Sequence, residues 1–142
     1  MTLGTLARGK PAWQSSLSRW SLRSDEASGP LTGPVSGEFS FHTAREARPW
    51  WMVDLRQTPA VGSVLVFNRM DLPIRANGLE TYVSRDGRRW ELAGRHAVSA
   101  PFGGSDGNPL EIAVNGTVRF VRVELPHTGI LHLDQIQVLR PA

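Results

Sequence analysis

The chain has 142 residues, 40% of them hydrophobic, and a formal net charge of only +3. This length is enough to bury a core, so we expect one domain over residues 1–142. The absence of cysteine excludes disulfide frameworks, cysteine-ligated zinc and thiol catalysis. The arginines are spread from Arg8 to Arg140 and form no basic helix, which argues against nucleic acid as a partner.

The first third of the chain predicts loops. Residues 15–41 are rich in Ser, Gly and Pro and show little hydrophobic periodicity. Long ordered loops in a compact domain commonly carry function. The N-terminus lacks a signal-peptide pattern, and no run of eighteen apolar residues occurs. We expect a soluble chain without membrane insertion, whose compartment the sequence leaves open.

From Trp50 onward, apolar residues alternate or cluster in short runs bounded by Gly, Pro, Asn and Asp, which is typical of strands. The expected strands are 50–55, 63–69, 79–84, 89–94, 110–114, 118–125 and 133–139. Asp86-Gly87 predicts a hairpin turn, and Asn115-Gly116 predicts a second one. Strands at this spacing indicate an all-β sandwich or jelly roll.

Six segments carry motifs of a known family. They are residues 6–16 (LARGKPAWQSS), 49–55 (PWWMVDL), 64–71 (VLVFNRMD), 83–90 (VSRDGRRW), 119–123 (RFVRV) and 131–138 (LHLDQIQV). Through them the chain resembles the discoidin domains, also called coagulation factor 5/8 type C or galactose-binding-like domains, and among these the fucose-binding F-type lectins. The resemblance implies a jelly roll of about eight antiparallel strands with a ligand site in the loops at one end.

The resemblance also implies a set of site residues. F-type lectins hold fucose with a His, then twenty-six residues, then Arg-x-Asp, then four residues and a second basic residue. His42 and Arg69 keep this separation and Asp71 follows, but Arg75 comes after three residues instead of four. Guanidinium and imidazole groups can bond the oxygens of a sugar, and Asp71 would orient the arginines before the ligand arrives. We therefore expect a lectin-like module in which His42, Arg69 and Arg75 bind a sugar.

Alternatives for these residues are open. Arg69 and Asp71 could form a surface ion pair of little energetic value, with His42 capping a turn. A vicinal disulfide that packs against the sugar in F-type lectins has no counterpart in this cysteine-free chain. The aromatic platforms considered for a sugar face are Phe41, Trp20 and Phe102, each of which could equally be part of the core.

Many members of the family bind calcium, with the first Glu of a closing "EVEV" motif among the ligands. Gln135 stands at that place here, and a neutral amide is a poorer ligand for a hard dication than a carboxylate. Asp25, Asp134 and Gln135 are the candidate ligands if a site exists. We expect no required cofactor, with bound calcium as the alternative.

Catalysis is not expected. The sequence has no GxSxG, HExxH or phosphate-loop pattern, and Asp54, within an apolar strand, reads as a satisfied buried acid. The rival functions are a protein- or phospholipid-binding adhesion module and an accessory domain of a polysaccharide-processing enzyme. The loops at 71–78 and 103–109 are polar and Gly-rich apart from Ile74, which favours a glycan over a membrane as the partner. Attachment to a larger multidomain protein fits either function.

Overall fold

The computed structural model of the chain describes residues 5–97 and 99–142. Within them the backbone forms eleven strands and two short 3-10 helices. The strands are β1 (Ala12–Gln14), β2 (Phe41–His42), β3 (Glu46–Ala47), β4 (Trp50–Asp54), β5 (Ala60–Asn68), β6 (Glu80–Ser84), β7 (Glu91–Arg95), β8 (Leu110–Thr117), β9 (Phe120–Glu124), β10 (Thr128–Gly129) and β11 (His132–Leu139). The helices are η1 (Glu26–Leu31) and η2 (Pro73–Ala76).

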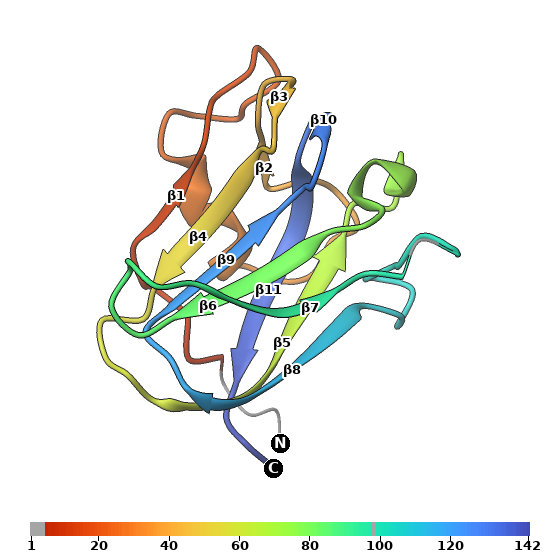
Figure 1. Cartoon of the computed structure of the whole chain (residues 1–142). Helices are drawn as coiled ribbons and strands as arrows, with labels where there is room; N and C mark the ends of the chain where they lie inside the picture. The colour runs from red at the N-terminus through yellow and green to blue at the C-terminus, as the bar shows by residue number, and fades with distance from the viewer. Residues whose placement is uncertain (1–4, 98) are drawn as a thin grey trace.

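The strands form two facing sheets (Figure 1). One has five strands in the order β1-β4-β9-β6-β7, and the other has four in the order β2-β11-β5-β8. A small third pair joins β3 and β10, and every pairing between strands is antiparallel. Eight of the strands have three or more residues. The predicted all-β jelly-roll sandwich of about eight antiparallel strands is therefore confirmed.

The core lies between the sheets and follows from strand alternation. Trp51 and Val53 of β4 are fully buried, whereas Trp50 and Met52 between them are only partly buried. This confirms that the two adjacent tryptophans point to opposite faces of the sheet. Trp51 packs on the ring of Phe41, 6.3 Å away between centroids, and its indole N–H donates to the Ala27 carbonyl at 2.7 Å. Trp51 thus joins the two sheets to η1.

Of the two predicted hairpins, one is confirmed and one is wrong. β6 and β7 pair directly across the Asp86-Gly87 turn. Asn115-Gly116 makes no hairpin, because β8 pairs with β5 while β9 pairs with β4 and β6. Both residues lie inside β8, where Asn115 has φ 51° at an irregularity in the pairing with β5, so the Asn-Gly signal marks a bulge within a strand.

The first third of the chain is ordered by one buried acid. Glu26 is 0% exposed, and its carboxylate accepts bonds from the Gln14 side chain and from the backbone N–H groups of Leu22 and His42, at 2.7–2.9 Å. These bonds tie the loop before η1 to β1 and β2. The opening strand begins at Ala12, later than the family motif at 6–16 suggested.

Figure 1 places the C-terminal end of the chain at the lower end of the sandwich, away from η2 and the start of β11. Among the described residues, no helix is long and apolar enough to cross a bilayer.

Candidate functional site

The loop end of the four-stranded sheet brings two histidines together. β2 places His42 directly opposite His132 of β11, and the ring centroids lie 5.4 Å apart. The neighbouring strand β5 ends at Asn68, so Arg69 emerges beside the pair. Strand register, which the sequence does not specify, therefore builds the centre of this cluster.

Arg69 is the best-fixed cation of the cluster. Its guanidinium lies over the ring of Phe39, with the carbon 4.9 Å from the ring centroid, and its Nη2 contacts Asp71 Oδ2 at 3.2 Å. The side chain of Arg69 is 17% exposed, whereas that of Asp71 is 78% exposed. The same Phe39 ring meets His42 edge-on at 5.1 Å. Asp71 thus pairs with Arg69, while the Phe39 ring packs against the guanidinium from one face.

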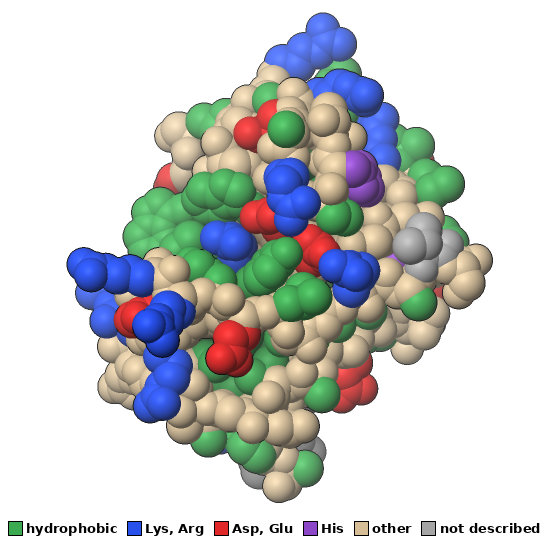
Figure 2. Space-filling model, in the orientation of Figure 1, with side chains coloured by type: hydrophobic (Ala, Val, Ile, Leu, Met, Phe, Trp, Pro, Cys, Tyr) green, Lys and Arg blue, Asp and Glu red, His purple; other side chains and the backbone are tan. Residues whose placement is uncertain are grey.

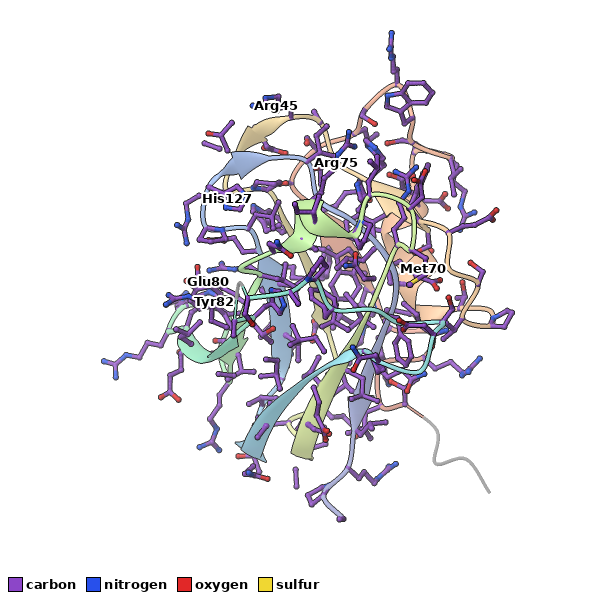
Figure 3. All side chains as sticks on the ribbon, turned by 90° about the vertical axis from the view of Figure 1, so that its right-hand side faces the viewer. Arg45, Met70, Arg75, Glu80, Tyr82 and His127 are labelled. Atoms are coloured by element: carbon purple, nitrogen blue, oxygen red, sulfur yellow. The ribbon has the colours of Figure 1, made fainter. Side chains whose placement is uncertain are left out.

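Arg75 projects from η2, as Figure 3 shows, and its side chain is exposed. The loop that carries it is held by Asn68, whose amide donates to the carbonyls of Pro73 at 3.0 Å and Phe102 at 2.8 Å. Leu72 adopts the left-handed conformation, φ 61°, as the backbone turns into η2. No acidic side chain of the described residues lies within ion-pair distance of Arg75.

The ring of His42 is buried but polar on one edge. Its Nδ1 lies 2.9 Å from the Thr43 carbonyl and 2.9 Å from the Ser18 hydroxyl. Because a carbonyl can only accept, Nδ1 carries the proton and Nε2 is left as an acceptor. Burial lowers the pKa of His42 and the nearby charges of Arg69 and Arg75 lower it further, against the opposing bond to Thr43. His42 is therefore a neutral imidazole near neutral pH.

His132 lies deeper and is also kept neutral. It is 1% exposed, and neither ring nitrogen has a hydrogen-bond partner among the described residues. Burial lowers its pKa to about 3, with further lowering by Arg69, His42 and Arg75. Protonation of His132 would place a third cation in a buried position next to two arginines, which is electrostatically unfavourable.

A hollow of about 400 Å³ opens beside the cluster. Its walls are Leu22, Gly37, Glu38, Phe39, Arg69 and Asp71. Arg69 and Asp71 therefore face the hollow, whereas His42 contacts Phe39 and does not line it, and Arg75 of η2 acts on His42 only through its charge. The structure groups all four predicted residues at one end of the sandwich, but only two of them form the wall.

Two of the three aromatic platforms considered are in the core. Phe41 is 0% exposed against Trp51, and Phe102 is 5% exposed with its ring 5.0 Å from that of His96, so neither can contact a ligand. Trp20 is 58% exposed, with Arg19 4.9 Å over its ring. Its backbone N–H donates to the same Ser18 hydroxyl that contacts His42, so Trp20 stands at the edge of the cluster.

The calcium candidates are separated and engaged by other groups. Asp25 pairs with Arg23 at the surface, while the Asp134 carboxylate accepts the backbone N–H groups of Ser36 and Gly37 at 2.9 and 2.7 Å. The amide of Gln135 donates to the Gly33 carbonyl at 2.8 Å. Within residues 5–97 and 99–142, no three His, Cys, Asp or Glu side chains gather as a metal site would need. Side-chain hydrogen bonds hold the 33–37 loop here.

Phe39, His132 and Glu26 belong to the site region and were missed from the sequence. Phe39 sits in a segment without periodicity, and its role follows from the position of Arg69 above it. His132 enters only through its register with His42. Glu26 is a lone acid in a loop, which ordinarily means a solvated side chain. No local sequence signal marks any of the three.

The loop end is also more apolar at its surface than the sequence suggested. Besides Ile74, Leu72 of the 71–78 loop is exposed, and so are Trp20, Leu22 and Met70. Leu22 lines the hollow, and the backbone N–H of Met70 donates to the carbonyl of Gly37, another lining residue. The expectation of polar end loops is corrected to a mixed apolar and cationic rim.

A β-sandwich that gathers cationic and aromatic side chains in its end loops has the architecture of the galactose-binding-like modules. The chain belongs to the F5/F8 type C family: the family model described as a NedA-like, galactose-binding domain matches residues 38–123. No curated protein matches the chain.

Solved structures similar to the chain include sugar-binding modules. The lectin domain of lectinolysin, solved with Lewis B antigen, is 28% identical, with a TM-score of 0.78 and 100% of each chain covered. An F-lectin, or fucolectin, from striped bass serum (Morone saxatilis) is 26% identical, with a TM-score of 0.80 over 97% of this chain and 49% of that one. A Streptococcus pneumoniae fucose-binding module shares the fold at 22% identity, a TM-score of 0.77, and 99% and 100% coverage.

Proposed function

We propose that the chain is a non-catalytic lectin module that binds a sugar at the hollow beside Arg69, with fucose-bearing glycans as the ligand class. The observation that carries the proposal is the hollow lined by Arg69, Asp71 and Phe39, with the Arg69 guanidinium over the Phe39 ring and the His42 ring against the same phenylalanine. Two similar structures, the lectinolysin lectin domain and the striped bass fucolectin, support it.

The cluster offers what a neutral sugar needs. Guanidinium groups donate hydrogen bonds to ring and hydroxyl oxygens, and a neutral imidazole nitrogen can accept a hydrogen bond from a hydroxyl group. The hollow pairs these donors with apolar side chains, Leu22 and Phe39, against which the C–H face or methyl group of a sugar would pack. Its volume, about 400 Å³, lies in the range of small-ligand sites. Arg69 is held before the ligand arrives, which lowers the ordering cost of binding.

The neutral state of His42 sets the expected pH dependence of binding. Since burial and the arginines lower its pKa, the ring should remain an acceptor through the neutral range. Once protonated, the ring loses its acceptor and repels Arg69 and Arg75. Sugar affinity should therefore hold near neutral pH and fall only as the pH drops below the ordinary titration range of histidine.

A glycan array of the isolated domain tests the proposal. Fucosylated glycans, including Lewis b antigen, should give the strongest signals, and matched glycans lacking fucose should give weak ones. Running the array with calcium and with chelator separates a metal-dependent lectin from a metal-independent one. Absence of binding to any glycan would overturn the proposal while leaving the family assignment intact.

A second candidate function is favoured by the exposed apolar rim. Trp20, Leu22, Leu72 and Ile74 are exposed in the loops that also carry Arg19, Arg69 and Arg75, a combination that suits the interface of an anionic membrane. The test is addition of glycan-free vesicles with and without phosphatidylserine, followed by Trp20 fluorescence. A blue shift with the anionic vesicles, absent in a Trp20→Ser variant, would support this second function over the first.

A further inference from the structure

The turn between β6 and β7 brings three arginines together. Arg85, Arg88 and Arg89 are all exposed, and none lies within ion-pair distance of an acidic side chain of the described residues. Figure 2 shows Lys and Arg side chains massed at the left of the molecule, where Figure 1 places this turn. Their charges are free to meet a ligand.

The turn is a rigid frame for these side chains. The Asp86 carboxylate accepts the backbone N–H groups of Arg88 and Arg89 at 2.8 and 2.9 Å, and the Ser84 hydroxyl accepts those of Asp86 and Gly87. Gly87 has φ 78°, and a Cβ there would lie 3.3 Å from the Phe120 ring. These bonds involve the backbone N–H groups of the turn, so they fix its backbone and leave the guanidinium groups available to a ligand.

A hollow of about 390 Å³ lies between this turn and the chain crossing from β8 to β9. Arg85 and Arg89 line one side of it, and Asn115 and Thr117 line the other. Asp86 and Glu91 also face it, so its walls carry both signs of charge together with hydroxyl and amide groups. A simple anion would meet the two acids as well as the two arginines, whereas a polyol can donate its hydroxyls to those acids.

We propose that this hollow is a second binding site, which takes an acidic sugar residue bearing a carboxylate or sulfate. Arg85 and Arg89 would hold the anionic group, by the paired donor geometry that guanidinium offers to carboxylate and sulfate oxygens. Asn115, Thr117 and the acids would meet the hydroxyls. The volume suits one or two sugar rings.

The second site is separate from the one beside Arg69. β5 runs from Ala60, paired with Thr117, to Asn68, paired with Leu133, so it spans the distance between the two ends. The eight steps between its nine residues, at about 3.3 Å each, place the two ends of β5 about 26 Å apart. The two sites can therefore be occupied together and tested independently.

The test is amide chemical-shift mapping with a heparin-derived disaccharide, which carries both uronate and sulfate groups. The shifts should fall on residues 83–91 and 114–118, and Arg89→Gln should weaken binding roughly tenfold, the scale of one charge-assisted contact. Arg45→Gln, which neutralises an exposed arginine at the other end, is the matched control and should leave the affinity unchanged. Salt should weaken the binding.

Three results would overturn the second site: no shifts at millimolar disaccharide, shifts confined to residues around Arg69, or equal affinity for a single-stranded oligonucleotide. The last would mean that charge alone is recognised. Arg69→Ala should leave disaccharide binding intact, so this site and the proposed lectin site fail or succeed separately. The neutral disaccharide lactose should produce no shifts at residues 83–91.

Discussion

Two arginine clusters in this molecule differ in where their acids lie. On the outer face of the five-stranded sheet, the buried carboxylates of Glu80 and Glu124 meet Arg48, with Nη2 at 3.0 and 2.7 Å, and Glu80 also binds Arg95 and the Tyr82 hydroxyl. Figure 3 shows Glu80 and Tyr82 side by side at this face. Burial raises the pKa of Glu80, but Arg95, Tyr82 and Arg48 outweigh it and lower the pKa overall.

The loop end has the opposite arrangement. Arg69 has a single acid partner, Asp71, which is largely exposed, and Arg75 has none among the described residues, while two neutral histidines lie beneath. In the sheet cluster, the carboxylates and the arginines bond to one another within the protein, and these bonds stabilise the fold. The loop cluster keeps donors and an acceptor unpaired, which costs stability and suits a ligand.

The largest expected effect is a loss of stability at acidic pH, caused by the protonation of His132. Its folded pKa, about 3, lies below the ordinary value of 6.5, so its contribution to stability is complete above pH 6.5 and is lost as the pH falls toward 3. The free energy of unfolding should fall by roughly 1 kcal/mol per pH unit in that window. Urea unfolding at pH 7, 5.5 and 4.5 measures it.

Replacing His132 by Phe should remove this slope, because the variant has no group to protonate at that place. His127→Gln, which changes an exposed histidine, is the control and should keep the slope of the unmodified protein. If the free energy of unfolding fell equally with pH in the unmodified protein and in His132→Phe, protonation of His132 would not govern the response to acid.

The next effect tests the sheet cluster. Glu80→Gln removes the charge that Arg48 and Arg95 share and should lower the free energy of unfolding by about 2 kcal/mol, since its partners are half-exposed and can be rehydrated. Sugar affinity should not change. Glu111→Gln, at an exposed position of β8, should leave stability unchanged. A loss of sugar binding in Glu80→Gln would erase the distinction between the clusters.

A smaller effect is expected from Asp71→Asn, which loosens the orientation of Arg69 without removing a donor to the sugar. Sugar affinity should fall by about 0.5 kcal/mol, or roughly twofold, because the pair is largely exposed. Asp25→Asn breaks a comparable exposed pair with Arg23 and should not alter affinity. Titration calorimetry distinguishes the two variants, and an affinity loss as large as that of an arginine deletion would make Asp71 a direct ligand contact.

The smallest effect concerns calcium. Asp134 and Gln135 already bond the 33–37 loop, so thermal melts with millimolar calcium and with chelator should coincide. A ligand that binds only the folded state must raise its stability. A large upward shift in Tm with calcium would show that oxygens other than these form a metal site.

The sequence predicted the fold and much of the loop cluster for different reasons. Strand alternation and the motif around Trp51 depend on local pattern, and the β6–β7 hairpin followed from its Asp-Gly turn. The Asn115-Gly116 hairpin failed because the same residues also suit a bulge inside a strand, and here they lie within β8 at an irregularity in its pairing with β5. A local Asn-Gly or Asp-Gly signal does not say whether the backbone turns back or continues its strand.

The site residues also divide into those that a local motif predicts and those that depend on long-range register and packing. His42, Arg69, Asp71 and Arg75 came from the spacing of a family motif, and the structure gathers them at one end. Phe39 and His132 came from long-range register and from packing beneath Arg69, which no nearby residue encodes. Phe41, taken as a possible platform, is fully buried against Trp51, whereas Phe39 is partly buried and lies under the Arg69 guanidinium.

The most direct test of the account is titration calorimetry of Lewis b antigen against the unmodified domain and Arg69→Ala. Among the described residues, Arg69 is the one cation that both lines the hollow and packs on an aromatic ring, so its removal should cost on the order of 1–3 kcal/mol of binding, roughly fivefold to a hundredfold in Kd. The free energy of unfolding should change by less than about 0.5 kcal/mol. Unchanged affinity in a folded Arg69→Ala protein would contradict the claim that this unpaired loop-end cluster is the sugar-binding site.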